Sequence, residues 1–319
     1  MSFSSEIKEE LVHVGVKRSC CIRAELTALI QMAGTIHLKG MRHLALTINT
    51  ENGAVARRAF SFLKKRYGIQ PQIQMTEHTQ PKKSHVYELM VDAEDALRVL
   101  RDTGIVEDDG DGFFNLNWRI QPSVVESECC KRAYLRGAFL GRGSMADPEK
   151  MYHLEFVVDR EELAASLVEL LQKKEINAKA IPRKDHFVVY LKEGEHVIRL
   201  LSMMGAHGAL LEVENIRILK DMRNNVNRKV NCETANINKT VNTAVRQIEC
   251  IRLVEQRIGF DRLSPNLRQI AELRLNYPDA SLQELGAMLD KPIGKAGVHH
   301  RLRKLEEMAN DLGLQQNKE

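Results

Sequence analysis

Hydrophobic residues recur along this chain at two spacings, helical and alternating, and the succession of the two occurs twice. Helical spacing predicts helices over residues 22–33, 54–67 and 94–102, and alternating stretches between them predict strands. The succession of helix, strand pair, helix, strand pair and helix returns over residues 129–203. An amphipathic helix is also predicted over residues 1–16. We therefore expect an α+β fold in which one unit of about a hundred residues occurs twice.

The residues themselves support a duplication. Cys20-Cys21-Ile22-Arg23-Ala24-Glu25-Leu26 corresponds to Cys129-Cys130-Lys131-Arg132-Ala133-Tyr134-Leu135, and each copy runs as a helix into a glycine, Gly34 or Gly143. Arg98, near the end of the first copy, aligns with Arg199 in the second. A repeat of this length is longer than solenoid repeats, and it implies two half-domains related by a pseudo-twofold axis.

Matching residues mark one face of the two repeated helices. Each set is spaced by four and therefore lies on one side of its helix; the sets are Ala24, Ala28 and Met32 in the first copy, and Ala133, Gly137 and Gly141 in the second. Small side chains let two helix backbones approach closely. We expect these two helices to pair on the pseudo-twofold axis.

The C-terminal part of the chain is predicted to be all helical. A helix is expected over residues 234–258, with Val241, Val245, Ile248 and Ile251 as its apolar stripe, and another from Ser264-Pro265 to Asn276. Ser281-Leu282-Gln283-Glu284 has the pattern of a capping box and opens a short helix. A tight turn at 290–293 and a last helix over residues 294–312 complete a helix-turn-helix, whose second helix typically enters the major groove of DNA.

These patterns suggest a division of the chain into four parts. We expect a first half-domain with its N-terminal helix and connector over 1–128, a second half-domain over 129–215, a basic linker over 216–232, and a helical domain over 233–319. Within that domain the helix-turn-helix would occupy about 264–312, with its core at 281–304.

The last helix is basic on the side opposite its apolar stripe of Val298, Leu302 and Leu305. Between Lys291 and Lys304 there are five basic side chains and no acid. Arg303 and the two histidines are predicted to reach base edges, and Lys291, Lys295, Arg301 and Lys304 to contact phosphates. The predicted DNA-binding residues are Ser281, Gln283, Lys291, Lys295, Ala296, His299, His300, Arg301, Arg303 and Lys304. The alternative is a solvated basic helix in a small helical bundle.

A second basic stretch precedes the helical domain and is rich in asparagine. Its basic residues are Arg217, Lys220, Arg223, Arg228 and Lys229. They could add phosphate contacts from outside the groove, or the stretch could be a charged linker.

The bulk composition narrows the class of protein. Apolar residues make up 43% and charged residues 28%, and a net charge of +4 does not by itself indicate a nucleic-acid partner. The first residues are acidic and amphipathic, and no apolar run is long enough to cross a bilayer. Four of the six cysteines form vicinal pairs, which rarely form disulfides, so we expect reduced thiols and a cytoplasmic protein. The pairs are interpreted as buried helix-start residues, since no second pair follows at zinc-binding spacing.

The acidic segment Glu107-Asp108-Asp109-Gly110-Asp111-Gly112 superficially resembles a calcium loop. A calcium loop needs an acid eleven residues after its first ligand, and from Asp108 that position holds Arg119. We expect a solvated turn between two short strands.

The sequence of the repeated helix resembles that of a known protein family. Leu135-Arg136-Gly137-Ala138-Phe139-Leu140-Gly141-Arg142-Gly143 and its counterpart from Leu26 to Gly34 resemble the signature helix of LAGLIDADG homing endonucleases. The resemblance implies that the residue before the final glycine of each helix would bind a divalent metal at the scissile phosphates. Those positions hold Ala33 and Arg142, which cannot bind magnesium. We therefore expect no catalytic residues and no cleavage of DNA.

A degenerate LAGLIDADG domain followed by a helix-turn-helix is similar to the WhiA family of bacterial regulators. The matching segments include 132–139, Arg223-Asn224, Asn227-Arg228, 230–233, Ala235-Asn236, Lys239-Thr240 and 281–286. The resemblance covers nearly the whole chain. It implies a DNA-binding protein that acts in cell division, chromosome segregation or, in some bacteria, sporulation gene control. It also implies that the helix-turn-helix, similar to the promoter-reading region of sigma factors, carries most of the DNA affinity.

We therefore predict a sequence-specific regulator associated with the nucleoid, with double-stranded DNA as its partner. Another transcription regulator or RNA polymerase could be a second partner, and no metal, cofactor or membrane is expected. One alternative is an active homing endonuclease, which needs the two missing acids. The other is a partner- or ligand-binding scaffold with secondary DNA binding. A basic sheet surface in the duplicated domain would favour DNA, and an apolar or mixed one would favour a partner.

Overall fold

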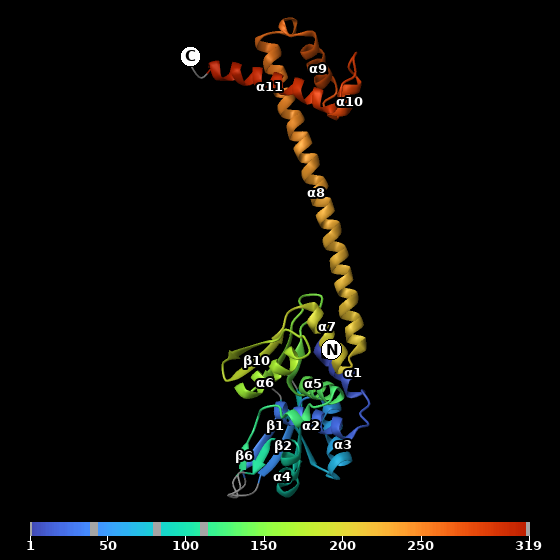
Figure 1. The fold of residues 1–319 in the computed structure, drawn as a ribbon, viewed down its shortest axis with the longest axis vertical. Helices are drawn as coiled ribbons and strands as arrows, with labels where there is room; N and C mark the ends of the chain where they lie inside the picture. Colours follow the sequence, from blue (N-terminus) through green and yellow to red (C-terminus); the bar gives the residue numbers. More distant parts are fainter. Residues whose placement is uncertain (1, 39–43, 79–83, 109–113, 317–319) are drawn as a thin grey trace. The chain divides into compact units, whose positions relative to one another are not determined.

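The computed structural model describes residues 2–38, 44–78, 84–108 and 114–316. It divides into two compact units, Met1–Lys220 and Asp221–Glu319 (Figure 1). The first unit holds both sequence repeats, and the second holds the helices of the C-terminal part.

The first repeat follows the predicted order. After α1 (Phe3–Val12), the elements are α2 (Ser19–Ala33), β1 (Gly34–Leu38), β2 (Leu44–Thr50), α3 (Gly53–Tyr67), β3 (Gln72–His78), β4 (Ser84–Val91) and α4 (Ala93–Asp102). The second repeat consists of α5 (Glu128–Arg142), β7 (Gly143–Met145), β8 (Leu154–Val158), α6 (Glu161–Gln172), β9 (Lys179–Arg183), β10 (His186–Leu191) and α7 (Gly194–Met204). The duplicated α+β fold is therefore confirmed.

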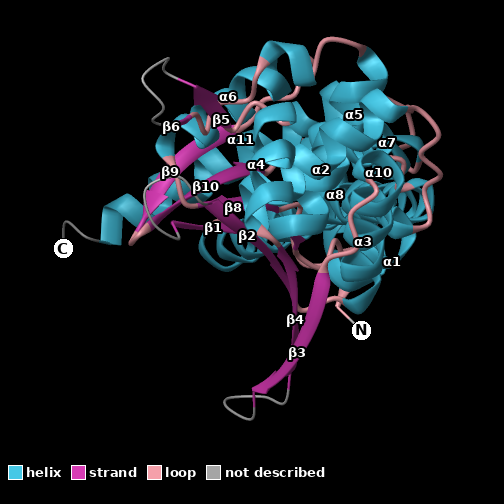
Figure 2. Cartoon of the chain, turned by 90° about the horizontal axis from the view of Figure 1, so that it is seen from below, coloured by secondary structure: helices cyan, strands magenta, loops and turns pink. Residues whose placement is uncertain are grey.

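Each repeat forms one antiparallel four-stranded sheet, and the strand orders match: β1-β2-β4-β3 and β7-β8-β10-β9. Strands β3 and β4 lie side by side in Figure 2. The aligned arginines make equivalent contacts. Arg98 donates a hydrogen bond to the carbonyl oxygen of Tyr67 at the end of α3, and Arg199 donates one to that of Lys174 just after α6. The repeat is thus preserved in side-chain contacts as well as in topology.

The connector between the repeats contains two short paired strands, β5 (Val106–Asp108) and β6 (Phe114–Leu116), and a 3₁₀ turn at Pro122–Val124. These are the two strands expected around the acidic segment. Residues 109–112 of that segment lie outside the described residues.

The helices α2 and α5 pack against each other at the centre of the first unit. Residues 24–33 of α2 and 133–140 of α5 are buried, and a Cβ added to Gly137 would lie 2.3 Å from the carbonyl oxygen of Glu25 and 3.0 Å from Cβ of Ala28. At Gly141 the nearest atom would be Cβ of Met32, at 2.7 Å. The residues of the predicted face therefore lie where the two backbones come closest.

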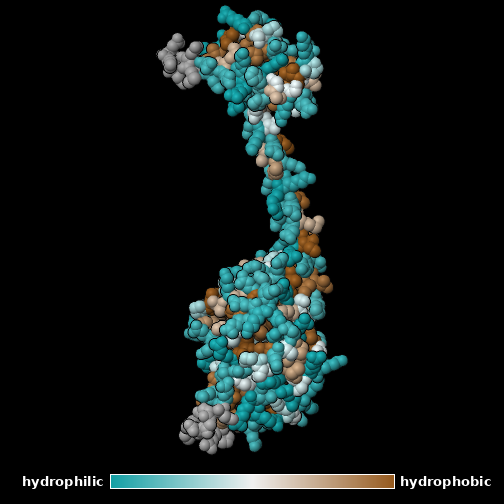
Figure 3. Space-filling model, viewed as in Figure 1, coloured by the Kyte–Doolittle hydropathy of each residue, from teal (hydrophilic) through white to brown (hydrophobic). Residues whose placement is uncertain are grey.

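The long helix α8 (His207–Arg257) corrects one expectation. The sequence suggested a linker or basic helix followed by a separate helix over 234–258, whereas the structure has one continuous helix of 51 residues. Val241 and Val245, predicted to lie in an apolar stripe, are about half exposed, while Ile251 is buried. Figure 3 shows such apolar side chains among the hydrophilic surface of this helix. The Asn-rich stretch was predicted to be a linker, but asparagine disfavours a helix only modestly, so a helix can continue through it.

The second unit continues with a 3₁₀ turn at Phe260–Arg262, α9 (Pro265–Asn276), α10 (Leu282–Ala287) and α11 (Lys295–Gln316). Ser264 occupies the N-cap of α9 as predicted, but its side chain makes no capping hydrogen bond. Among the described helices of both units, none is long and apolar enough to cross a membrane.

Candidate nucleic-acid interface

The short helix α10 begins with the capping box that the sequence predicted. The Ser281 hydroxyl accepts a hydrogen bond from the backbone N–H of Glu284 at 3.3 Å, and the Glu284 carboxylate accepts one from the N–H of Ser281 at 2.7 Å. The bonds from Ser281 lower the pKa of Glu284. Two amides at the start of α10 are thereby satisfied, so even this six-residue helix has a fixed beginning.

The turn between α10 and α11 crosses directly over Gly286. The N–H of Ile293 donates a hydrogen bond to the carbonyl oxygen of Gly286 at 3.1 Å, and a Cβ at Gly286 would lie 2.3 Å from the carbonyl oxygen of Ile293. No side chain fits in that space, so glycine is required for this close crossing. The turn therefore sets the angle at which α11 leaves α10.

The apolar side of α11 is buried against the other helices of the second unit. The predicted stripe of Val298, Leu302 and Leu305 is at most 1% exposed, and Ala309 is 3% exposed. These residues share a core with residues of α8, α9 and α10 such as Ile251, Ile270 and Leu285. Burial of this stripe fixes the rotation of α11 about its own axis, and so decides which side chains face solvent.

The opposite side of α11 is exposed and basic. Of the ten predicted DNA-binding residues, nine are exposed and Arg301 is half-buried. Arg303 forms an i,i+4 ion pair with Glu307, with 3.0 Å between Nε and Oε1. This pair lies at the surface, where such pairs contribute little stability, so Arg303 is free to exchange Glu307 for another partner.

A groove of about 440 Å³ lies beside these residues. It is lined by Ser281, Gln283, Lys295 and His299 from the predicted set, and also by Lys239, Thr240 and Thr243 of α8. No residue spacing along the chain connects α8 with the helix-turn-helix. The segment Lys239-Thr240 was recognised only as part of the family resemblance, and the fold places it next to the basic face.

The second basic stretch, 217–229, is helical and forms part of α8. Within the first unit, Arg217 pairs with Glu214, and Lys220 donates a hydrogen bond to the carbonyl oxygen of Pro148 while lying over the ring of Tyr152. Arg223, Arg228 and Lys229, which belong to the second unit, are exposed. Arg217 and Lys220 therefore already have partners, and the last three offer the more accessible charge.

In the first unit, the ends of the two signature helices line one cleft of about 670 Å³. Ala33 and Arg142 both face it, together with Lys8, and Glu51 is the single acid among its described lining residues. Arg142 pairs with Asp159, with 2.6 Å between Nη1 and Oδ1. Burial lowers the pKa of Lys8, and Glu51 partly offsets this effect. The two positions that hold acids in nucleases thus lie together here, but they carry a methyl group and a guanidinium group.

The open faces of the two sheets have a mixed character. In the central strands, buried residues such as Leu46 and Phe156 alternate with Thr47, Asn49, Glu155 and Val157, which lie on the other face. Glu88 lies opposite Asn49, whereas Lys179 and Arg183 of β9 lie opposite Tyr190 and His186. Cross-strand partners share a face. The described strands therefore present acids, bases, amides and apolar groups together, and not a uniformly basic surface.

Comparison with known proteins covers nearly the whole chain. Residues 19–106 match the model of the WhiA N-terminal LAGLIDADG-like domain, 131–223 that of the WhiA LAGLIDADG-like domain, and 226–309 that of the WhiA C-terminal HTH domain. A relative from Alkaliphilus metalliredigens is 50% identical over 311 residues, which is 97% of this chain and 98% of the relative. One from Clostridium beijerinckii is 49% identical, covering 98% of this chain and 99% of its own. Both are named probable cell division protein WhiA.

A solved structure shows the same fold. The crystal structure of full-length WhiA from Thermatoga maritima is 25% identical to this chain, with a TM-score of 0.59, and the match covers 98% of this chain and 99% of that one. Two LAGLIDADG-like domains followed by a helix-turn-helix domain are thus common to both.

Proposed function

The chain belongs to the WhiA family, and on that premise we propose that it is a sequence-specific, double-stranded-DNA-binding regulator of bacterial cell division. The observation that carries the proposal is the orientation of α11, whose apolar stripe is buried and whose basic side faces solvent. The proposal extends to chromosome segregation or sporulation-linked transcription as the processes served, and to the cytoplasmic nucleoid as the place of action.

The geometry supports a division of roles in DNA binding. With α11 in the major groove, Arg303, His299 and His300 would reach base edges, because they lie on the exposed side of its first turns. Lysine ammonium groups are point charges suited to phosphates, and Lys291, Lys295 and Lys304 flank this row. Ser281 and Gln283 lie beside the groove that Lys295 lines, where a phosphate backbone would pass. The exposed Arg223, Arg228 and Lys229 of α8 would add sequence-independent attraction.

The proposal includes the absence of nuclease activity. Cleavage by this fold needs carboxylates at the ends of the twin helices to hold divalent metal ions. Ala33 has no ligand atom, and the Arg142 guanidinium would repel a cation. The matching family models are described as LAGLIDADG-like domains of a regulatory family, which agrees with this view.

A second role is favoured for the duplicated unit. Its described strands lack the excess of positive charge that backbone binding to DNA requires. We propose that this sheet surface contacts a protein partner, such as another transcription regulator or RNA polymerase, while α11 binds DNA.

Arg303→Ala should weaken binding to the preferred duplex by about 1–3 kcal/mol, if Arg303 forms a bidentate contact with a base. Affinity for that duplex and for a scrambled duplex is measured by fluorescence anisotropy at several salt concentrations. The expected result is a loss confined to the preferred duplex. If affinity fell equally for both duplexes, and the slope of log affinity against log salt concentration fell in magnitude by about one, Arg303 would be a phosphate contact instead.

Arg268→Ala provides a matched control. Arg268 forms the same i,i+4 pair, with Glu272, on the surface of α9, with 2.8 Å between Nε and Oε1, and it pairs in addition with Asp261 at 3.1 Å. Removing Arg268 takes away the same charge and the same kind of ion pair without touching α11. If both variants weakened binding to the preferred duplex equally, net charge and not base recognition would explain the effect.

A further inference from the structure

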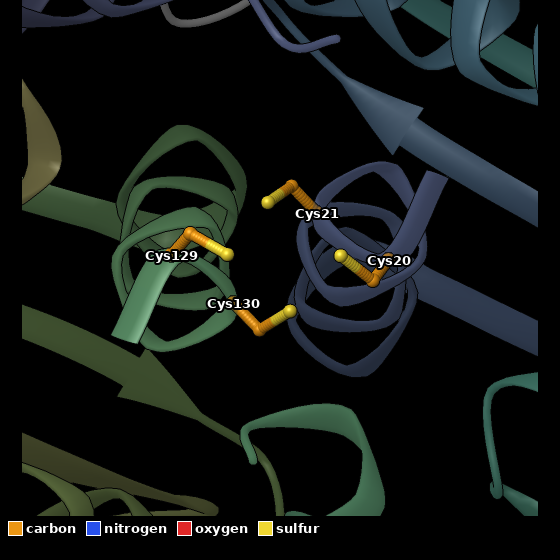
Figure 4. A group of neighbouring side chains, drawn as sticks. All are labelled: Cys20, Cys21, Cys129 and Cys130. Atoms are coloured by element: carbon orange, nitrogen blue, oxygen red, sulfur yellow. The ribbon is translucent and has the colours of Figure 1, made fainter. Parts of the chain in front are cut away.

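The two vicinal cysteine pairs meet in the first unit. Cys20 and Cys21 lie in the first turn of α2, and Cys129 and Cys130 lie in the first turn of α5. Because these helices pair across the pseudo-twofold axis, their first turns lie side by side, and the four sulfur atoms point toward a common centre (Figure 4). All four sulfurs lie within 4.8 Å of one another. The sequence interpretation, which rejected a metal site because no second pair follows at close spacing, missed this juxtaposition.

The arrangement has nearly the dimensions of a tetrathiolate site. In such a site the metal–sulfur distance is about 2.3 Å, which places the sulfurs of a tetrahedron roughly 3.8 Å apart. Sulfurs separated by at most 4.8 Å would each need to move inward by only about half an ångström to reach that geometry. Rotation about the Cα–Cβ bonds can supply such a movement without a change in the backbone.

The surroundings favour a group of net negative charge. Four thiolates outnumber the charge of a divalent cation, and both helices direct the positive ends of their dipoles at the cluster. In the described structure, neither helix has a side chain that caps its first amides; the N-cap residues are Arg18 and Ser127. Arg18 donates from Nη1 toward the sulfur of Cys129 at 3.6 Å, and the Ser127 hydroxyl lies 3.1 Å from the same sulfur. Each of these neighbours can stabilise a thiolate.

Access and proton loss are also compatible with metal entry. Cys20 is exposed and Cys129 half-buried, whereas Cys21 and Cys130 are buried behind them. Ions can therefore approach from the exposed side, and the thiols would lose their protons on coordination.

We propose that Cys20, Cys21, Cys129 and Cys130 bind one thiophilic divalent metal ion, Zn²⁺, in a tetrathiolate site that joins the two repeats. Four thiols release their protons to solvent as the four sulfur–metal bonds form, and no atom changes its oxidation state. The site is structural, because four protein ligands leave no open position. It also lies at the start of helices 15 residues long, roughly 20 Å from the cleft at their ends.

The test uses the full-length chain purified under reducing conditions. The protein is equilibrated with Zn²⁺, freed of excess metal by gel filtration, and analysed for bound metal by mass spectrometry of the elements. Co²⁺ is then substituted, because a tetrathiolate site gives intense sulfur-to-cobalt charge-transfer bands and tetrahedral d–d bands. We expect one ion per chain and the tetrathiolate spectrum.

The variants separate this site from incidental thiol binding. Cys20→Ser and Cys129→Ser change the two more accessible ligands, and each should reduce bound zinc from one ion per chain to near zero. Cys232→Ser and Cys250→Ser remove a cysteine outside the cluster and should retain the full ion. Circular dichroism checks that each variant is folded, and a variant that fails this check is replaced by the corresponding alanine variant.

Three results would overturn the proposal. The first is less than a tenth of an ion per chain in the unmodified protein, and the second is equal zinc in cluster and control variants. The third concerns freshly reduced protein that is exposed to air with zinc present. If its cysteine-containing peptides lose the mass of two hydrogens for each disulfide bond, disulfides form in preference to the metal site.

Discussion

Replacing Glu25 by Gln should lower the free energy of unfolding of the first unit by about 3–5 kcal/mol. The Glu25 side chain is fully buried in α2. Its carboxylate pairs with Arg58 of α3 at 2.5 Å and with Arg136 of α5 at 2.9 Å. A neutral amide would leave two buried guanidinium groups without a countercharge, which is costly even when the intact pair contributes little net stability.

The two arginines extend this network to further elements. Arg58 also donates to the carbonyl oxygen of Val12 at the end of α1, and Arg136 to that of Met204 at the end of α7. Glu25 thus connects both repeats and the N-terminal helix through one carboxylate. We expect the loss to appear as cooperative destabilisation of the whole first unit in urea unfolding followed by circular dichroism.

Glu175→Gln is the matched control. Glu175 pairs with Arg199 at 2.7 Å, but its side chain is 84% exposed, so this substitution should change stability by less than about 1 kcal/mol. A Glu25→Gln protein as stable as the control would show that the buried network does not hold the repeats together.

Gly137→Ala should destabilise the first unit by about 1–3 kcal/mol. In an ordinary helix interior the same substitution stabilises by about 1 kcal/mol, because alanine has the higher helix propensity. Here the added methyl would lie 2.3 Å from the carbonyl oxygen of Glu25, so α2 and α5 would have to separate. The sign of the change in unfolding free energy therefore shows directly whether the two helices are closely packed. Thermal unfolding of the variant measures this change.

A double variant distinguishes backbone from side-chain crowding. The methyl of Ala28 would be the second contact, at 3.0 Å, so Ala28→Gly relieves it but leaves the Glu25 carbonyl in place. We expect no rescue of Gly137→Ala by Ala28→Gly. A neutral or stabilising Gly137→Ala, or full rescue in the double variant, would contradict the close approach of the two backbones.

The sequence predicted those elements that are marked by a short local motif or by a repeated pattern of hydrophobic residues. The duplicated order of helices and strands follows from hydrophobic spacing, and the capping box at Ser281 and Glu284 is visible in four residues. The buried stripe of Val298, Leu302 and Leu305 was predicted for the same reason, because helical periodicity determines which side faces the core.

Features that depend on distant residues escaped the sequence. The cysteine cluster joins positions more than a hundred residues apart, and their approach follows only from the pairing of α2 with α5. Lys239 lies on α8, and no residue spacing in the sequence indicates that α8 packs beside α10 and α11. In the structure it nevertheless lines the same groove as Lys295. The boundaries between the four predicted parts and the individual DNA contacts remain predictions, and the structure supplies for the contacts only burial, exposure and neighbours.

The central claim is tested most directly by selection from a random duplex library with magnesium present, followed by sequencing of bound and nicked molecules. The account predicts enrichment of one motif without nicks, and its loss when Lys295, His299 and Arg303 are replaced together by alanine. These side chains are exposed, so the triple variant should remain folded. Site-specific nicks, or enrichment that persists in the triple variant, would contradict a regulator that recognises DNA through α11.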